Sequence, residues 1–278
     1  MYHLISGFYA EWTKKARYNV LIVGLSGVGK SCAIEKIKSI YLKRPPLPPT
    51  KIAPTVGQNV FDLALPKLHL HFWDLGGSPS VRTLWAKYYE ESHAVVWVVD
   101  ARDFVGLTDT ASDNGKGKGK LVDRDAGSDA AERREESWRI LADLLVHPSL
   151  EGQPILILAN KCDACSSDPD MALGEAERKA LTSKIQRWFH QKLAQIGDEN
   201  TGTSTNHVKE SKLPSNIFAD DEGDGGDLGT SAQRPMHGFP SSTRDYDWDV
   251  IATSAIDGTG MHDAIDWLSI RVQTLNKH

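Results

Sequence analysis

The apolar positions of the chain form short runs that predict the strands of one sheet. Four runs are almost entirely apolar and rich in β-branched residues, which is typical of strands buried on both faces of a parallel sheet. Between residues 60 and 73, apolar and polar positions alternate instead, and this pattern predicts an antiparallel hairpin with strands at 60–65 and 68–73. The four buried strands are expected at 18–23, 94–99, 154–159 and 250–253.

Apolar residues at helical spacing predict the helices that cover this sheet. They are expected at about 31–41, 131–146, 173–196 and 260–275, between the strands, so the fold class is α/β with helices on both faces. Residues 1–15 carry an i, i+3, i+4, i+7 stripe and are expected to form an amphipathic helix. Such a helix either packs on the domain or lies on a membrane surface, and both alternatives stay open.

Three stretches interrupt these elements, so residues 16–278 are expected to form a single domain with insertions. Residues 43–54 contain Pro45-Pro46-Leu47-Pro48-Pro49 and should form an extended, stiff loop. Residues 108–128 and 198–243 contain few apolar side chains and are expected to be disordered surface insertions. The second holds an acidic run, but Ser231 stands where a calcium loop needs its closing Glu.

Composition narrows the classes of function. The net charge of −5 argues against a broad nucleic-acid-binding surface. Cys32, Cys162 and Cys165 are an odd number of cysteines without a signal sequence, which favours a reducing compartment. A zinc site would need a second cysteine pair, and a membrane-spanning helix an apolar run of ~20 residues; the sequence contains neither.

The stretch from Gly24 to Ser31 matches the phosphate-binding pattern G-x-x-x-x-G-K-[ST], directly between a predicted strand and a predicted helix. Backbone N–H groups of such a loop and the helix N-terminus attract phosphate. Lys30 is expected to reach the β- and γ-phosphates, and the Ser31 hydroxyl to bind Mg²⁺. The nucleotide-binding residues expected here are Gly24, Ser26, Gly27, Val28, Gly29, Lys30, Ser31 and Cys32.

The run Asn160-Lys161-Cys162-Asp163 follows a buried strand and predicts guanine as the base. The Asp163 carboxylate is able to accept two hydrogen bonds from N1 and N2 of guanine, whereas adenine would leave it unpaired. Asn160 is expected to bond the other edge of the base, Lys161 to cover the ring, and Ser254-Ala255 to offer a backbone N–H to the guanine carbonyl. These expectations favour GTP and GDP over ATP. They therefore argue against a P-loop kinase or ATPase.

Two further loops are expected to sense the γ-phosphate. Asp74-Leu75-Gly76-Gly77 follows the second hairpin strand, so Asp74 is expected to hold Mg²⁺ through water and the Gly77 N–H to contact the γ-phosphate. Thr55, after the proline-rich loop, is the expected second hydroxyl ligand. The predicted Mg²⁺ ligands are therefore Ser31, Thr55 and Asp74.

On these residues the chain resembles the Ras-like small GTPases, and within them the Arf and Arf-like family. The resemblance implies a Ras-like G domain of the P-loop NTPase class, with a mostly parallel six-stranded sheet, one antiparallel edge strand and helices on both faces. Residues 1–7 and 87–89 look most like the ADP-ribosylation-factor-related branch of the Golgi. The motifs that carry the resemblance to the Arf and Arf-like family are Pro54-Thr55-Val56-Gly57-Gln58-Asn59, Trp73-Asp74-Leu75-Gly76-Gly77, Leu84-Trp85-x-x-Tyr88-Tyr89, Asn160-Lys161-Cys162-Asp163 and Ser254-Ala255.

The resemblance implies a GDP/GTP switch in Golgi vesicle-mediated transport. In the GTP state the hairpin would slip by two residues, which keeps each side chain on its face, and the N-terminal helix would be freed to bind membrane. The implied partners of this cytoplasmic monomer, peripheral on Golgi membranes, are an exchange factor, a GTPase-activating protein, a Golgi membrane receptor and effectors. Family effectors typically read an aromatic patch, here Trp73 and Tyr88, with Gln58 in the third place.

The largest departure from the family pattern follows Gly77, where a water-orienting Gln is replaced by Ser78 and then Pro79. Serine is too short to reach that water, so intrinsic GTP hydrolysis is expected to be very slow. Two functions stay open: a cycling switch, which Thr55 and Gly77 favour, and a GTP-loaded binding platform, which Ser78 favours. The residues expected to take part in hydrolysis are Lys30, Thr55, Gly77 and Ser78.

Overall fold

The computed structural model describes residues 15–109, 121–123, 128–166, 173–199 and 247–275. They belong to two compact units, the second of which spans residues 193–244 and is described only for 193–199. The helix expected at 1–15, apart from Lys15, and the acidic run at 220–227 lie outside the described residues, as does nearly all of the insertion expected at 198–243. None of the helices in the described part is both long enough and apolar enough to span a membrane.

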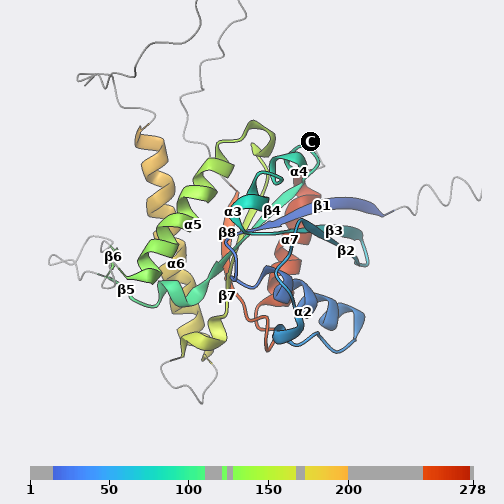
Figure 1. Ribbon diagram of the computed structural model, residues 1–278, viewed down its shortest axis with the longest axis horizontal. Coiled ribbons are helices and arrows are strands. Elements are labelled where there is room, and N and C mark those ends of the chain that lie inside the picture. Colours follow the sequence, from blue (N-terminus) through green and yellow to red (C-terminus); the bar gives the residue numbers. More distant parts are fainter. Residues whose placement is uncertain (1–14, 110–120, 124–127, 167–172, 200–246, 276–278) are drawn as a thin grey trace, which may run out of the picture. The chain divides into compact units, whose positions relative to one another are not determined.

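The first unit is built on the predicted six-stranded sheet, whose order is β2-β3-β1-β4-β7-β8 (Figure 1). Every neighbouring pair is parallel except β2 and β3, which form the predicted antiparallel hairpin at the edge. A three-residue connection (65–67) permits only an antiparallel return, so β2 becomes the antiparallel edge strand. The strands are β1 (Ala16–Val23), β2 (Gln58–Ala64), β3 (Leu68–Leu75), β4 (Ala94–Asp100), β7 (Ile155–Asn160) and β8 (Trp248–Ala252).

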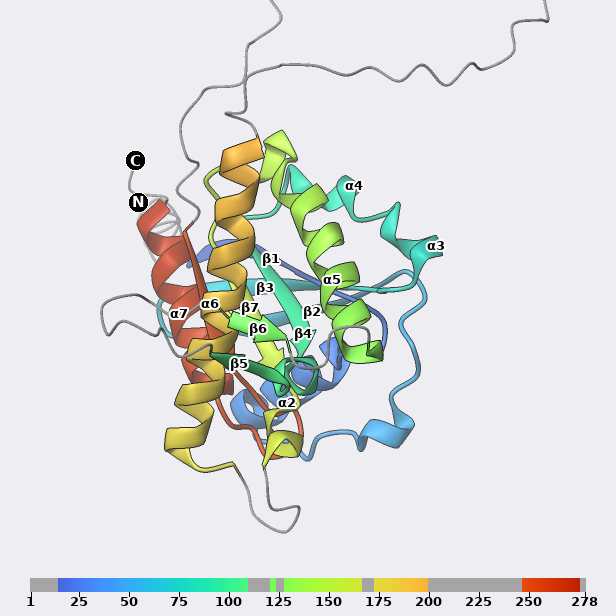
Figure 2. The same cartoon turned by 90° about the vertical axis from the view of Figure 1, so that its left-hand side faces the viewer.

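Four long helices cover the two faces of this sheet, as Figures 1 and 2 show. On one face, α2 (Lys30–Leu42) and α7 (Met261–Leu275) share a single apolar cluster with the sheet. The other face carries α5 (Asp129–Leu145) and α6 (Glu175–Glu199), where Trp97 of β4 donates to Ser137 of α5 at 3.1 Å. Both faces are thus covered, which is why every residue of β4 and of β7 is buried.

Several short elements were not predicted from the sequence. Strands β5 (Leu107–Asp109) and β6 (Leu121–Asp123) pair with each other, so residues 108–109 and 121–123 of the insertion expected at 108–128 belong to a two-stranded ribbon. The proline-rich loop contains one 3-10 turn, η1 (Pro49–Lys51), because proline is tolerated at a first helical position, where no N–H is needed. The others are α3 (Pro79–Arg82), α4 (Ala86–Tyr89), η2 (Ala101–Phe104), η3 (Pro148–Leu150) and η4 (Cys162–Cys165).

Candidate nucleotide-binding site

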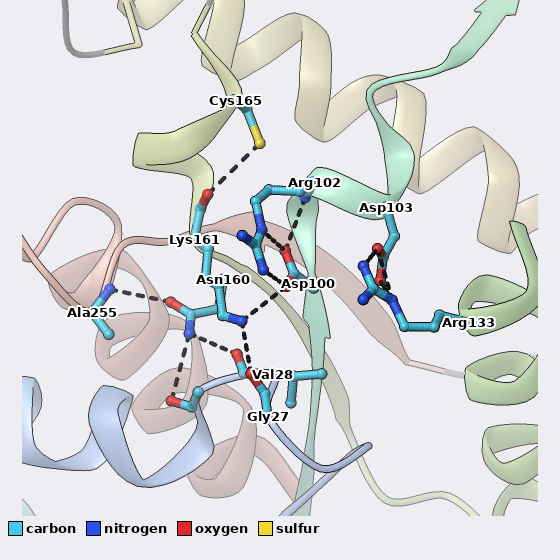
Figure 3. A network of polar contacts seen from close by, with 11 residues as sticks. Gly27, Val28, Asp100, Arg102, Asp103, Arg133, Asn160, Lys161, Cys165 and Ala255 are labelled. Atoms are coloured by element: carbon cyan, nitrogen blue, oxygen red, sulfur yellow. Dashed lines mark hydrogen bonds and ion pairs between the residues drawn. The ribbon is translucent and has the colours of Figure 1, made fainter. Parts of the chain in front are cut away.

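The candidate site lies beyond the carboxyl ends of the parallel strands, where open α/β sheets bind their ligands. The phosphate loop follows β1, Asp74 is the penultimate residue of β3, and Asp100 and Asn160 are the last residues of β4 and β7. Side chains from these strand ends reach across to one another and to Ala255, which follows β8 (Figure 3). Residues distant in the sequence therefore form one polar network.

Two glycines of the phosphate loop have no substitute at their positions. Gly24 has φ of +146°, and a Cβ there would lie 2.3 Å from the carbonyl oxygen of Val98. Gly29 has φ of +94°, and its Cβ would lie 2.3 Å from Nδ2 of Asn160. A side chain at either place would push the loop off β4 or off Asn160. In the same loop Val28 is buried and Ser26 and Gly27 are exposed, while Cys32 lies in the first turn of α2.

Lys30 is held under the phosphate loop, with only 6 % of its surface exposed. Its ammonium donates to the carbonyl oxygens of Gly24 (3.0 Å) and Leu25 (2.8 Å). Burial lowers the pKa of Lys30 to about 8, although the nearby charge of Asp74 opposes this shift. A group of anionic oxygens at this place would stabilise the charged form, since an opposite charge favours ionisation. Burial therefore destabilises the charged form of Lys30 more than the charge of Asp74 stabilises it.

Ser31, Thr55 and Asp74 bring three side-chain oxygens together. Ser31 Oγ lies 2.9 Å from Thr55 Oγ1 and donates to Asp74 Oδ2 at 2.5 Å, and Thr55 Oγ1 lies 3.4 Å from the same carboxylate oxygen. Asp74 Oδ1 is buried without a hydrogen-bond partner, and burial raises the pKa of Asp74 despite the hydrogen bond from Ser31 and the charge of Lys30. Hydroxyl and carboxylate oxygens are the ligands that Mg²⁺ prefers, so these residues fit that ion.

The loops that carry Thr55 and Gly77 are held against each other. The Gly76 N–H donates to the carbonyl oxygen of Gly57 at 3.0 Å, and a Cβ at Gly76 would lie 2.4 Å from the carbonyl oxygen of Thr55. Gly77 lies against the phosphate loop, where a Cβ would be 2.7 Å from Lys30 Nζ. Trp85 fixes this arrangement by donating its indole N–H to the Gly76 carbonyl oxygen at 3.0 Å.

The Ser78 hydroxyl is hydrogen-bonded to Ser80 rather than to a residue of the candidate site. The two hydroxyl oxygens lie 3.2 Å apart, and the Ser78 backbone leads into α3, with Pro79 as the first helical residue. Arg82 of α3 donates through Nε to the Gly77 carbonyl oxygen at 3.0 Å and pairs with Glu136 of α5 at 2.9 Å. The loop after Gly77 is thus held from α5, through a residue that the sequence did not mark.

Asn160 links the phosphate loop to the loop of Ala255 through its side-chain amide (Figure 3). Nδ2 donates to the Val28 carbonyl oxygen at 2.9 Å, and Oδ1 accepts from the Ala255 N–H at 3.1 Å. The Ser254 N–H donates to the Thr259 carbonyl oxygen at 3.0 Å. Both N–H groups expected at the guanine carbonyl therefore have partners within the protein in this structure.

Lys161 and Asp163 flank the place expected for the base. The ammonium of Lys161 donates to the Gly27 carbonyl oxygen at 2.7 Å and to Asp100 Oδ2 at 2.9 Å. Asp163 has a buried carboxylate oxygen, Oδ1, without a hydrogen-bond partner. A buried acceptor without a donor destabilises a protein by about 1–3 kcal/mol, so this carboxylate fits a ligand with N–H donors such as guanine.

Asp100 is the main residue of the site to which the sequence assigned no role. Its carboxylate accepts from Arg102 at 2.9 and 2.6 Å as well as from Lys161. Burial alone would raise the pKa of Asp100, but the hydrogen bonds from Arg102 and Lys161 outweigh burial and lower it. The available signal was its position, an acidic residue directly after a buried strand.

The expected effector patch is also assembled, on the hairpin edge. The rings of Trp73 and Tyr88 have centroids 5.2 Å apart, and the Tyr88 hydroxyl donates to the side-chain oxygen of Gln58. By contrast, the described residues include no cluster of three or more His, Cys, Asp or Glu side chains arranged for a metal.

Comparison with known proteins gives consistent matches. The model of the ADP-ribosylation factor family matches residues 4–113. ADP-ribosylation factor-like protein 3 of Saccharomyces cerevisiae is 36% identical over 165 residues, 59% of this chain and 69% of that protein. ADP-ribosylation factor-related protein 1 of Bos taurus is 35% identical over 190 residues, 67% of this chain and 80% of that protein. The solved Arl6 BBS3 small GTPase of Trypanosoma brucei, with bound nucleotide analogue GppNp, covers 93% of this chain and 99% of its own at TM-score 0.52; at 19% identity it shows a shared fold alone.

Proposed function

The chain belongs to the ADP-ribosylation factor family of small GTPases, and from that premise we propose that it is a GDP/GTP switch in vesicle traffic at the Golgi. Membership of the family makes it a GTP-binding switch protein. We propose in addition that it acts at the Golgi, hydrolyses GTP very slowly and works with partner proteins. The observation that carries the proposal is the meeting of Thr55 and Gly77 beside Ser31 and Lys30.

GDP and GTP differ only in the γ-phosphate, so a switch needs residues whose contacts depend on that group. Thr55 and Gly77 come from two separate loops and both lie beside residues of the phosphate loop. In our proposal Ser31, Thr55 and Asp74 hold Mg²⁺, Lys30 pairs with the phosphates, and the Gly77 N–H contacts the γ-phosphate. Loss of the γ-phosphate releases both loops, which changes the surface that partners read.

Recognition of guanine is assigned to Asp163, because its unpartnered oxygen needs donors. Lys161 covers the ring with its aliphatic stem, and Asp100 holds the ammonium in place. Asn160 keeps the phosphate loop and the Ala255 loop together around the base. Adenine offers no pair of donors at the corresponding edge, so ATP is excluded.

Hydrolysis is proposed to be very slow without an activating protein. Even a Ras protein with its glutamine hydrolyses GTP at only about 10⁻⁴ s⁻¹, and Ser78 bonds its neighbour Ser80. Single-turnover hydrolysis on GTP-loaded protein tests this: wild type should be inert and Ser78→Gln should hydrolyse. Rapid hydrolysis by wild type would refute this account of Ser78. An inert Gln variant would favour the second function, a GTP-loaded platform that recruits partners.

The Golgi assignment is supported by the resemblance of residues 1–7 and 87–89 to the ADP-ribosylation-factor-related branch, the name that relatives with 34–35% identity also carry. We propose that an exchange factor, an activating protein, a Golgi receptor and effectors act on a monomeric switch. Co-sedimentation of the full chain with Golgi membranes tests this. Binding should be stronger with a GTP analogue than with GDP, and equal binding would refute nucleotide-controlled membrane association.

A further inference from the structure

The proline-rich segment, residues 43–51, has the repeat of a polyproline II helix but takes no part in the site described above. Pro45-Pro46 and Pro48-Pro49 are two proline pairs separated by Leu47. A polyproline II helix has three residues per turn, so Pro46 and Pro49 would lie on one edge once the 3-10 turn η1 (Pro49–Lys51) extends. This spacing is the P-x-x-P pattern that aromatic-lined grooves of SH3 and WW domains read.

The structure leaves the whole of this segment open to solvent. Each residue from 43 to 51 is exposed, and Leu47 has 51 % of its surface accessible. Pro48 has φ of −62° and ψ of 142°, which is close to polyproline II geometry. Leu47 has the only N–H between Pro45 and Pro49, and within the described part of the chain that N–H forms no hydrogen bond. The Leu47 N–H is therefore free to pair with another molecule. The carbonyl oxygens of Pro48 and Pro49 already accept from the N–H groups of Lys51 and Ile52 in the turn η1.

Cationic side chains stand at both ends of the proline repeat. Lys43 and Arg44 precede it and Lys51 follows it, and no acidic residue lies between residues 43 and 54. None of these three side chains forms an ion pair among the described residues. We propose that residues 43–51 are a docking segment for an SH3-type domain, whose aromatic groove takes the prolines and whose acidic rim takes the cations.

Each end of the segment is attached to an element that carries residues of the nucleotide site. Leu42 ends α2, the helix that begins with Lys30 and Ser31, and Thr55 follows Lys51 by four residues. When Thr55 is held beside Ser31 and Asp74, the segment is anchored at both ends and loses less conformational entropy on docking. The domain should therefore bind better in the GTP state, and in return it should raise the affinity for GTP by the same factor. This coupling rests on the proposed switch, whereas the docking itself does not.

The alternative is that the prolines form only a stiff spacer between α2 and Thr55. A spacer has no use for exposed cations at its ends or for a groove-binding period. The two explanations differ in one respect, because a spacer binds nothing.

The test uses the full chain loaded with GDP or with a non-hydrolysable GTP analogue, titrated with purified SH3 domains with acidic groove rims and with purified WW domains. At least one SH3 domain should bind, at least tenfold more weakly to Pro46→Ala/Pro49→Ala and to Lys43→Ala/Lys51→Ala. Pro148→Ala, at another exposed proline, is the control and should bind like wild type. Unchanged binding of a fluorescent GDP shows that each variant is folded.

Absence of binding by every SH3 domain would overturn the proposal, as would binding by WW domains alone. Unchanged affinity for Lys43→Ala/Lys51→Ala would refute the role of an acidic rim. Equal affinity in the two nucleotide states would overturn the coupling and leave the docking in place. If the wild-type protein did not bind GDP at all, the proposed function would be contradicted instead. Failure of the docking proposal and failure of the proposed function are therefore distinguishable.

Discussion

The substitution Asp163→Asn tests base recognition most directly. Asp163 Oδ1 is buried and lacks a partner, so the carboxylate is left with an acceptor that N1 and N2 of guanine are able to satisfy. A hydrogen bond to a charged group contributes about 1.5–3 kcal/mol, so two of them contribute about 3–6 kcal/mol. Asparagine keeps one acceptor oxygen, and the expected loss of GTP affinity is therefore at the lower end, about 10²–10³-fold.

The same substitution should change which base is preferred. Xanthine carries a carbonyl at C2 where guanine carries an amino group, and the amide NH₂ of the Asn variant is able to donate to that carbonyl. Wild type should prefer GTP over XTP, and Asp163→Asn should prefer XTP. The assay is competition of each nucleotide against a fluorescent analogue of the preferred base.

The control for this experiment is Asp143→Asn, which changes an exposed carboxylate on α5. It should bind both nucleotides like wild type. The unfolding temperature without nucleotide should be no lower for Asp163→Asn than for wild type, because the substitution removes the charge of a carboxylate whose buried Oδ1 has no partner. Wild-type affinity of the variant for GTP would refute the role of Asp163. An equal loss for GTP and XTP would show that the substitution disturbs the site rather than the choice of base.

Three further predictions concern the phosphate and base sides of the site. Because burial lowers the pKa of Lys30 to about 8 and phosphates favour its charged form, GTP affinity should fall about tenfold from pH 7 to pH 9, while Lys30→Arg, which does not titrate there, should show a much smaller change by calorimetry. In Gly77→Ala the new methyl would lie 2.4 Å from the Gly24 carbonyl oxygen, so the preference for a GTP analogue over GDP should fall by about 1–3 kcal/mol, and an unchanged preference would contradict the role of Gly77. Asp100→Asn loosens Lys161 and should speed GDP release on the order of tenfold in a fluorescence chase; an unchanged rate would mean that the ion pair does not hold the lysine.

The short hairpin and the ribbon illustrate where pattern reading succeeds and where it stops. Alternating apolar residues on both sides of Pro66-Lys67 sufficed for β2 and β3, because a period of two and a tight turn are local properties. The ribbon of β5 and β6 pairs residues such as Leu107 and Asp123 across a Gly- and Lys-rich stretch with no such pattern. Three-residue strands are too short to show a period, so composition alone predicted an insertion without structure.

The sequence by itself determined the phosphate loop, the order of strands and helices, and the polar residues that follow the strands. These features are local: a loop of backbone N–H groups needs only its glycines, and a buried strand needs only its apolar run. Only the tertiary structure decided that Asn160 bonds Val28, 132 positions away, and that Asp100 holds Lys161. Such contacts depend on which strands become neighbours, and β4 adjoins β1 and β7 through packing of helices on both faces rather than through any pattern within one segment.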